Sequence, residues 1–354
     1  MRFPTILFVA ACLLCASLVI VAQESSAAPG PAKYRFNANT DLVFLPTRVQ
    51  KKNGETIHGL RPEQFIVEDN GIRQPVHVDA APESSSLSIV VLVQCSRSSP
   101  EEFANMKGLG TMIEGIVGNS RYEVAIVGYG DRPYMLGDFS SRPEAARLAL
   151  SRLSSCGDFN AATVDAINYA TGMLRTRPAD YRRAILLVSE MRDHGSSARL
   201  DDAVAKLGIT DTVIYSVAFS PVVQAATRGF RAKPRGSPAP SKNTAAPMPA
   251  YNDPVPTLEL PPQLLPLVNA LRQNTASELA ALSGGDYATF TTKRAFDEDL
   301  QRISNQIRNY YLLSFAPGTK AAPGLHAIRI RIAGNSSAVV QTRRSYYWSE
   351  TSAR

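Results

Sequence analysis

The stretch SIVVLVQCSRSS, residues 88–99, decides the fold class of this chain. Its first half, Ser88 to Val93, is a short apolar run rich in β-branched residues, which is typical of a strand buried on both faces. The run passes directly into polar residues that begin at Gln94. In open α/β sheets, ligands bind at the carboxyl ends of the strands. The stretch therefore predicts a buried parallel sheet and a candidate site at residues 94–98.

Strand-like and helix-like segments alternate after this stretch, which is the pattern of a parallel sheet covered by helices on both faces. The predicted strands are 88–93, 122–129, 134–139, 184–188, 212–218 and 286–290, with 134–139 expected as an antiparallel edge. The predicted helices are 99–117, 141–153, 162–175, 197–207, 262–284 and 292–309. The sequence thus predicts a doubly wound, Rossmann-like α/β domain over about residues 85–309.

The flanking segments, 36–84 and 310–350, have strand character instead. Strands are predicted at 40–50, 65–67 and 76–78, and again at 310–315, 325–332 and 338–348. The N-terminal strands are too few and short to close a core alone. We therefore expect N- and C-terminal strands to pair in a small β-sandwich that flanks the α/β domain.

Residues 1–28 have the composition of an export signal. Arg2 precedes a nearly unbroken apolar run from Phe3 to Ala22, and Ala22 and Ala28 are small residues suited to cleavage. An uncleaved run of this length can also span a bilayer, and residues 9–12 resemble a lipobox. The sequence does not decide whether this segment is cleaved, lipidated or kept as an anchor. All three fates predict an exported chain that is periplasmic, secreted or part of the cell envelope. If the segment is retained, the chain lies close to the membrane.

The composition narrows the classes of partner. Of 354 residues, 44% are hydrophobic and 19% charged, which is typical of a globular chain, and the net charge is +7. The Lys and Arg residues form no compact block with interleaved aromatics, so we expect no nucleic-acid binding.

Residues 221–262 are rich in proline and basic residues, which predicts an extended loop. That loop is either a solvated linker or a contact for acidic partners.

The sequence carries no motif of a common enzyme class. Its four histidines have no zinc-ligand spacing, and no Gly-x-Ser-x-Gly elbow is present. We therefore expect no enzymatic activity. One catalytic alternative stays open, a thiol enzyme built on Cys95 with His194, and it requires a reactive thiol of low pKa.

Four motifs carry a family resemblance. They are SIVVLVQCSRSS (88–99), GDFNAATVDAINYA (157–170), ILLVSEMRDHGS (185–196) and the run from TASELAALSGG to NYYLLSF (275–315). In this order they resemble von Willebrand factor A-like domains, and more narrowly the VWFA-related Acidobacterial domain group. The resemblance covers about residues 36–350. It implies a doubly wound domain of the von Willebrand type and a role in binding, adhesion or assembly at the cell envelope.

The resemblance also implies a metal-dependent adhesion site of two carboxylates, two serines and a threonine. The matching positions here are Gln94, Ser96, Ser98, Ala161 and Glu190. A neutral amide replaces one carboxylate, a methyl group replaces the threonine, and a longer Glu replaces the second Asp. Hard cations prefer oxygen ligands, and carboxylate charge raises their affinity. We therefore expect a degenerate site with no cofactor, although weak Mg²⁺ or Mn²⁺ binding stays open.

Only two cysteines, Cys95 and Cys156, lie beyond residue 28. The resemblance places both in loops that meet over the strand ends. A disulfide there would tie the loops that a cation otherwise bridges, and an oxidising compartment favours it. The alternative is two independent buried cysteines.

These observations predict a non-catalytic, exported binding or adhesion module that contacts a protein or a surface polymer. The expected ligand-binding rim consists of Gln94, Ser96, Arg97, Ser98, Asp158, Asn160, Glu190, Arg192 and Asp193. The alternative is a structural scaffold or assembly factor of an envelope complex, tethered through the basic Pro-rich loop. The sequence leaves the ligand and the oligomeric state open.

Overall fold

The computed structural model describes residues 42–79, 86–96, 109–117, 122–178, 181–198, 212–219, 265–318 and 322–348. Several predictions fall outside these ranges: the export signal, the Pro-rich loop, Arg97 and Ser98, and most of the helix expected at 197–207. None of the helices in the described ranges is long and apolar enough to cross a membrane.

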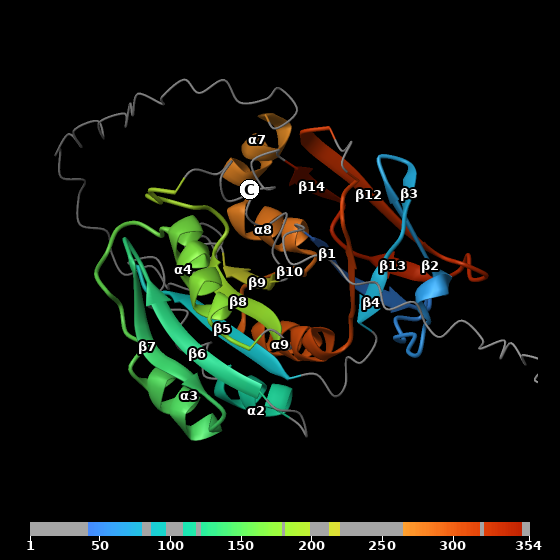
Figure 1. Ribbon diagram of the computed structural model, residues 1–354. Helices are drawn as coiled ribbons and strands as arrows, with labels where there is room; N and C mark the ends of the chain where they lie inside the picture. Colours follow the sequence, from blue (N-terminus) through green and yellow to red (C-terminus); the bar gives the residue numbers. More distant parts are fainter. Residues whose placement is uncertain are drawn as a thin grey trace, which may run out of the picture. The chain divides into compact units, whose positions relative to one another are not determined.

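Within the described residues, the centre of the fold is a six-stranded sheet in the order β10-β9-β8-β5-β6-β7 (Figure 1). Its strands are β5 (Leu87–Gln94), β6 (Tyr122–Tyr129), β7 (Pro133–Ser140), β8 (Arg182–Glu190), β9 (Thr212–Phe219) and β10 (Tyr287–Phe290). All neighbours pair in parallel except β7, which is antiparallel to β6. This confirms the predicted sheet and its antiparallel edge. The strand order reverses between β5 and β8, which is where such sheets bind ligands.

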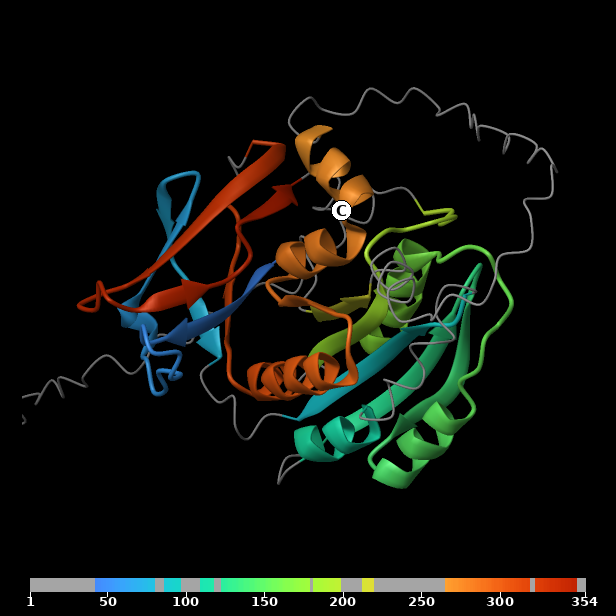
Figure 2. The ribbon, with the colours of Figure 1, turned by 180° about the vertical axis from the view of Figure 1, so that it is seen from behind.

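Helices cover both faces of this sheet, as Figures 1 and 2 show. One face packs against α2 (Leu109–Val117), α3 (Pro143–Ser151) and α9 (Lys293–Arg308). The other packs against α4 (Thr163–Arg175), α7 (Leu265–Gln273) and α8 (Thr275–Ser283). Successive strand residues point to opposite faces, so Ile89 and Val91 join one core while Val90 and Leu92 join the other. Both cores are apolar, which explains the unbroken apolar run in the sequence.

The flanking strands form two further sheets, each of four strands in the described residues. One has the order β13-β1-β11-β4, with β1 (Val43–Gln50), β4 (His77–Asp79), β11 (Tyr311–Phe315) and β13 (Val339–Gln341). The other has the order β14-β12-β2-β3, with β2 (Phe65–Asp69), β3 (Ile72–Gln74), β12 (Gly324–Ile332) and β14 (Ser345–Trp348); a short 3-10 turn, η1 (Pro62–Gln64), precedes β2. Both sheets contribute to one hydrophobic cluster. Strands from the two ends of the chain pair directly, β1 with β11 and β2 with β12, as the sequence predicts.

Two predicted elements are wrong in their extent. The single helix expected at 262–284 is broken at Asn274, whose side chain accepts a hydrogen bond from the backbone N–H of Ser277 and starts α8. An Asn side chain competes for backbone groups in this way, so it favours a cap over a helix interior. The strand expected at 338–348 is two strands in different sheets, β13 and β14. Between them, the buried Arg343 reaches the carbonyl oxygen of Ser283.

Candidate functional site

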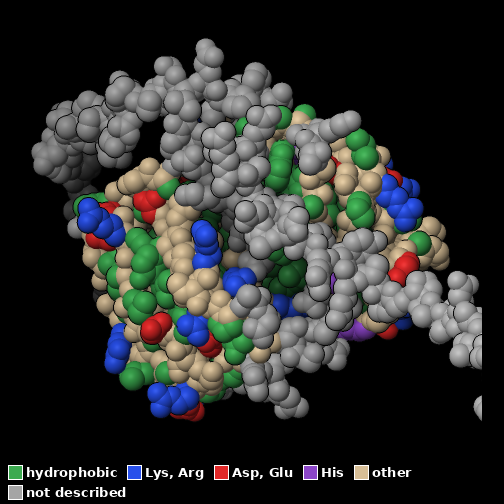
Figure 3. Space-filling model, in the orientation of Figure 1, with side chains coloured by type: hydrophobic (Ala, Val, Ile, Leu, Met, Phe, Trp, Pro, Cys, Tyr) green, Lys and Arg blue, Asp and Glu red, His purple; other side chains and the backbone are tan. Residues whose placement is uncertain are grey.

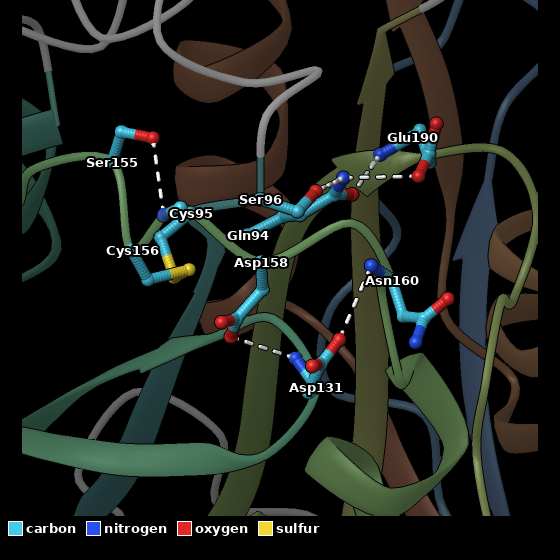
Figure 4. The surroundings of a disulfide bond; sticks show 10 residues. Gln94, Cys95, Ser96, Asp131, Ser155, Cys156, Asp158, Asn160 and Glu190 are labelled. Carbon is cyan, nitrogen blue, oxygen red and sulfur yellow. Dashed lines mark hydrogen bonds between the residues drawn. A yellow bond between two sulfur atoms is a disulfide. The ribbon is translucent and has the colours of Figure 1, made fainter.

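The candidate site lies at the carboxyl ends of β5 and β8, where the strand order reverses (Figure 4). Gln94 is the last residue of β5 and Glu190 the last of β8. The Oε1 atom of Gln94 accepts the backbone N–H of Glu190 at 2.7 Å. Because a backbone nitrogen only donates, this contact fixes which end of the amide is the oxygen. The Nε2 group of Gln94 must therefore face the opposite direction.

The Nε2 group of Gln94 joins two of the three other matched residues that the structure describes. It donates to the Oγ of Ser96 at 2.6 Å and to the Oε1 of Glu190 at 3.0 Å. These oxygens are the kind that a hard cation would bind. The amide nitrogen thus bridges a hydroxyl and a carboxylate as a cation would, but with N–H groups and no net charge.

Glu190 is partly buried beneath this amide. Burial raises the pKa of its carboxyl group, and the nearby His194 and the hydrogen bond from Gln94 offset part of that rise. Within the described ranges, no group of three or more His, Cys, Asp and Glu side chains is placed to hold a metal ion. In this arrangement the Glu190 carboxylate accepts a hydrogen bond from the Gln94 amide.

Ala161, the position matched to the threonine, is fully buried. Its backbone forms a two-way bridge with His194, with N–O distances of 3.0 Å and 2.9 Å. The nearest hydroxyl along the chain is that of Thr163, which the sequence reasoning missed. Its Oγ1 lies 3.2 Å from the buried hydroxyl of Tyr129. The hydroxyl group of Thr163 thus forms a hydrogen bond that links the start of α4 to the end of β6.

Cys95 and Cys156 are joined by a disulfide, with their Cα atoms 5.4 Å apart. That separation is ordinary for a disulfide. The backbone N–H of Cys156 also donates to the carbonyl oxygen of Cys95 at 3.0 Å. The bridge ties the loop after β5 to the loop that leads into α4 (Figure 4). Because Cys95 is part of the disulfide, it has no free thiol that could pair with the imidazole of His194.

The acidic residues expected on the rim are engaged in building the loops. Asp158 accepts the backbone N–H of Asp131 at 2.9 Å, and Asp131 in turn accepts that of Asn160 at 3.2 Å (Figure 4). Asp193 accepts the backbone N–H of Val164 at 3.0 Å, in the first turn of α4. A carboxylate at a helix N-terminus stabilises the helix. These contacts give both Asp158 and Asp193 a structural role.

The loop just after the disulfide is one exposed part of the rim. Asn160 is exposed, and the neighbouring Phe159 is 77% exposed, which the sequence reasoning did not single out. Arg192, in the loop after β8, is also exposed, and its Nε donates at 3.3 Å to the carbonyl oxygen of Gln273, the last residue of α7. The rim thus offers an aromatic ring, an amide and the side chain of Arg192, while the carboxylates of Asp158 and Asp193 accept backbone N–H groups.

On the face shown in Figure 3, the visible Lys and Arg side chains are interspersed with Asp and Glu. The described atoms of this face form no broad patch of one sign.

No protein-family model and no curated protein matches the sequence. Several solved structures are similar to parts of the fold. The conserved hypothetical protein BatB from Bacteroides thetaiotaomicron is 16% identical and matches 62% of this chain and 99% of its own, with a TM-score of 0.37. An aerotolerance-related membrane protein from Bacteroides fragilis is 15% identical over the same shares, with a TM-score of 0.39. The vWF domain of the type V pili tip protein Mfa5 from Porphyromonas gingivalis is 15% identical, over 31% of this chain and 39% of its own, with a TM-score of 0.28.

These identities and TM-scores are too low to carry an argument about activity or partners. The fold assignment rests on the strand order, the antiparallel edge strand and the helices on both faces. By these features the chain contains a doubly wound, Rossmann-like α/β domain.

Proposed function

We propose that this chain is a binding module of the exported or cell-envelope class that holds its partner without a metal ion. The binding surface is the rim over Gln94, Ser96 and Glu190, in the domain that we assign to residues 85–309. The partner is a protein or a surface polymer. This assignment also follows the resemblance to the VWFA-related Acidobacterial domain group and the export-like segment at residues 1–28.

The observation that carries the proposal is the amide of Gln94, which hydrogen-bonds both Ser96 and Glu190. A cation entering between those oxygens would have to displace the amide and would gain only one carboxylate ligand in return. Carboxylate charge provides much of the affinity for such ions. A partner is then bound by apolar and hydrogen-bonding contacts, for which the exposed Phe159 and Asn160 are available.

A thermal melt tests the metal independence. A ligand at a hundred times its dissociation constant stabilises by about 2.7 kcal/mol. We expect the melting temperature of the exported chain to be the same in EDTA, in excess Mg²⁺ and in excess Mn²⁺. As a positive control, the double variant Gln94→Asp, Ala161→Thr restores two oxygen ligands and should gain a metal-dependent shift. A shift in the original chain that Glu190→Ala abolishes would refute metal independence.

A binding assay tests the rim. We expect the purified chain to bind envelope fractions of its own host equally in EDTA and in Mg²⁺. Phe159→Asp should weaken that binding, because it places a charge at the exposed ring. Leu148→Asp is the matched control, since Leu148 is 56% exposed but lies on α3, away from the rim. Equal loss in both variants, or no loss in Phe159→Asp, would contradict the assignment of the rim.

The alternative role is a scaffold or assembly factor tethered through residues 221–262. Five basic residues precede the first acidic residue in that segment, which favours acidic partners. Deletion of residues 221–262 distinguishes the two roles. Binding that survives the deletion supports the rim, and binding that is lost supports the tether.

A further inference from the structure

A buried polar cluster lies among the flanking strands, apart from the rim. It consists of His326 on β12, Asp69 at the end of β2 and Tyr346 on β14. These strands are neighbours in the sheet β14-β12-β2-β3 (Figure 1). The strand β2 belongs to the N-terminal segment, whereas β12 and β14 belong to the C-terminal segment. The cluster therefore links the two flanking segments where their strands pair.

The three side chains of this cluster are buried and joined to one another. The side chains of His326 and Asp69 are 6% and 7% exposed, and Tyr346 is 1% exposed. The Nδ1 atom of His326 lies 2.8 Å from the Oδ1 atom of Asp69. The Tyr346 hydroxyl donates to the other carboxylate oxygen at 2.9 Å. Burial and the neighbouring Asp69 raise the pKa of Tyr346, so its hydroxyl keeps its proton.

The second ring nitrogen of His326 constrains the protonation of the ring. Its Nε2 atom lies 2.7 Å from the backbone carbonyl oxygen of Ala322. A carbonyl oxygen only accepts, so Nε2 must carry a hydrogen. A neutral ring with that hydrogen would have a bare Nδ1 atom, which would face the carboxylate oxygen of Asp69 at 2.8 Å. Two acceptors in contact repel each other. One further proton must therefore lie between His326 and Asp69.

The chemistry of the two groups places this proton on the ring. Free imidazole is a stronger base than a free carboxylate, with reference pKa values of about 6.5 and 3.9. The hydrogen bond from Tyr346 favours the ionised form of the Asp69 carboxyl group. An imidazolium beside a carboxylate has no net charge, whereas a buried charge without a partner is costly. Both ring nitrogens of His326 then donate, Nδ1 to Asp69 and Nε2 to Ala322.

Asp69 and Tyr346 are the titratable groups that face this ring from β2 and β14. Successive strand residues point to opposite faces, so the other charged side chains of β2, β3 and β12 lie on the opposite face of the sheet. These are Glu68, Arg73, Arg329 and Arg331. From the facing sheet, the apolar ring of Phe315 packs on Tyr346, while His77 on β4 is exposed. Among the described residues, the carboxylate of Asp69 is thus the charge that faces the ring.

We propose that His326 and Asp69 form a pH-sensitive link between β2 and β12, which holds one buried proton while the sheet is formed. Loss of this proton leaves two acceptors in contact, at either Asp69 or Ala322. In an unfolded chain, a histidine releases its proton at a pH of about 6.5. Above that pH the folded chain binds one proton more than the unfolded chain, so its stability falls as pH rises. The link shares no residue with the rim and does not depend on the proposed function.

Nitrogen-15 NMR of the histidine rings in the full chain tests the proton directly. We expect one ring with hydrogens on both nitrogens at about pH 8, where an exposed histidine carries only one. Its N–H signals should exchange slowly with deuterated water, because the ring is buried. That slow exchange identifies His326 without a substitution. The proposal is overturned if no slowly exchanging ring carries both hydrogens at this pH.

Urea denaturation across neutral and mildly alkaline pH tests the effect on stability. One additional bound proton raises the unfolding equilibrium constant by up to about tenfold for each pH unit. We expect this rise in the original chain relative to His326→Gln, whose side chain does not titrate. His77→Gln is the matched control, because His77 is an exposed histidine on β4, and it should follow the original chain.

Parallel pH curves for the original chain and His326→Gln would overturn the proposal, as would a relative stability that increases with pH. The NMR measurement needs no substitution, so it decides the case even if His326→Gln does not fold. Neither result affects the rim, which is tested by other residues.

Discussion

The chain contains two polar clusters that differ in how completely they are paired. At the end of the central sheet, the amide of Gln94 joins Ser96 and Glu190 and accepts a backbone N–H. In a cavity lined in part by α9, Arg48 and Gln306 each keep a buried atom without a partner in the described residues. Burying a polar group is costly unless it is hydrogen-bonded. Among the described residues, the first cluster therefore contains no buried side-chain atom without a partner, whereas the second contains two.

The largest expected effect on stability comes from the Cys95–Cys156 disulfide, which lies beside the first cluster. The disulfide joins residues 61 positions apart. In the chain-entropy model a loop of that length contributes about 4 kcal/mol to the free energy of unfolding. We expect the double variant Cys95→Ala, Cys156→Ala to lose about that much in urea denaturation. Reductant should lower the stability of the original chain to the same level and leave the double variant unchanged. A loss below about 1 kcal/mol would mean that the hydrogen bonds alone hold these loops.

The next test removes one amide from each cluster. Gln94→Leu strips a hydrogen bond from Ser96, from the Glu190 carboxylate and from the Glu190 backbone, so we expect a loss of about 2–3 kcal/mol. Gln306→Leu removes one bond to Asp286 but also an unpaired oxygen, so the expected loss is under about 1 kcal/mol. Urea denaturation measures both. Equal losses would show that the two clusters do not differ in how completely they are paired.

The smallest effect is the pH dependence of the first cluster. Burial raises the pKa of Glu190 in the folded chain, so the folded state binds this proton more tightly than the unfolded state. Its contribution to stability therefore falls as pH rises from below the unfolded pKa, near 4.5, through the raised folded value. Glu190→Gln keeps an acceptor for Gln94 and does not titrate. We expect the stability of the original chain relative to this variant to decrease over that pH window. A constant or increasing difference would contradict the raised pKa.

Much of the fold follows from local patterns in the sequence. The apolar run at 88–93 and the strand–helix alternation predict the sheet, its antiparallel edge and the covering helices. The break at Asn274 and the split between β13 and β14 are not predicted. Both depend on whether a side chain finds a backbone partner, which periodicity does not reveal. Arg343 illustrates this, because it is a charged residue that the sequence alone would place in solvent but that is fully buried.

By itself, the sequence determined which residues occupy the candidate site: an amide at 94, a methyl group at 161 and a glutamate at 190. It could not decide what those residues do. The hydrogen bond from the Glu190 backbone fixes the direction of the Gln94 amide, and that bond joins residues 96 positions apart. The buried atoms of Arg48 and Gln306 that have no hydrogen-bond partner among the described residues were equally hidden, because their strand and helix lie at opposite ends of the chain. Composition sets the chemistry that is available, while pairing depends on distances that only the folded chain defines.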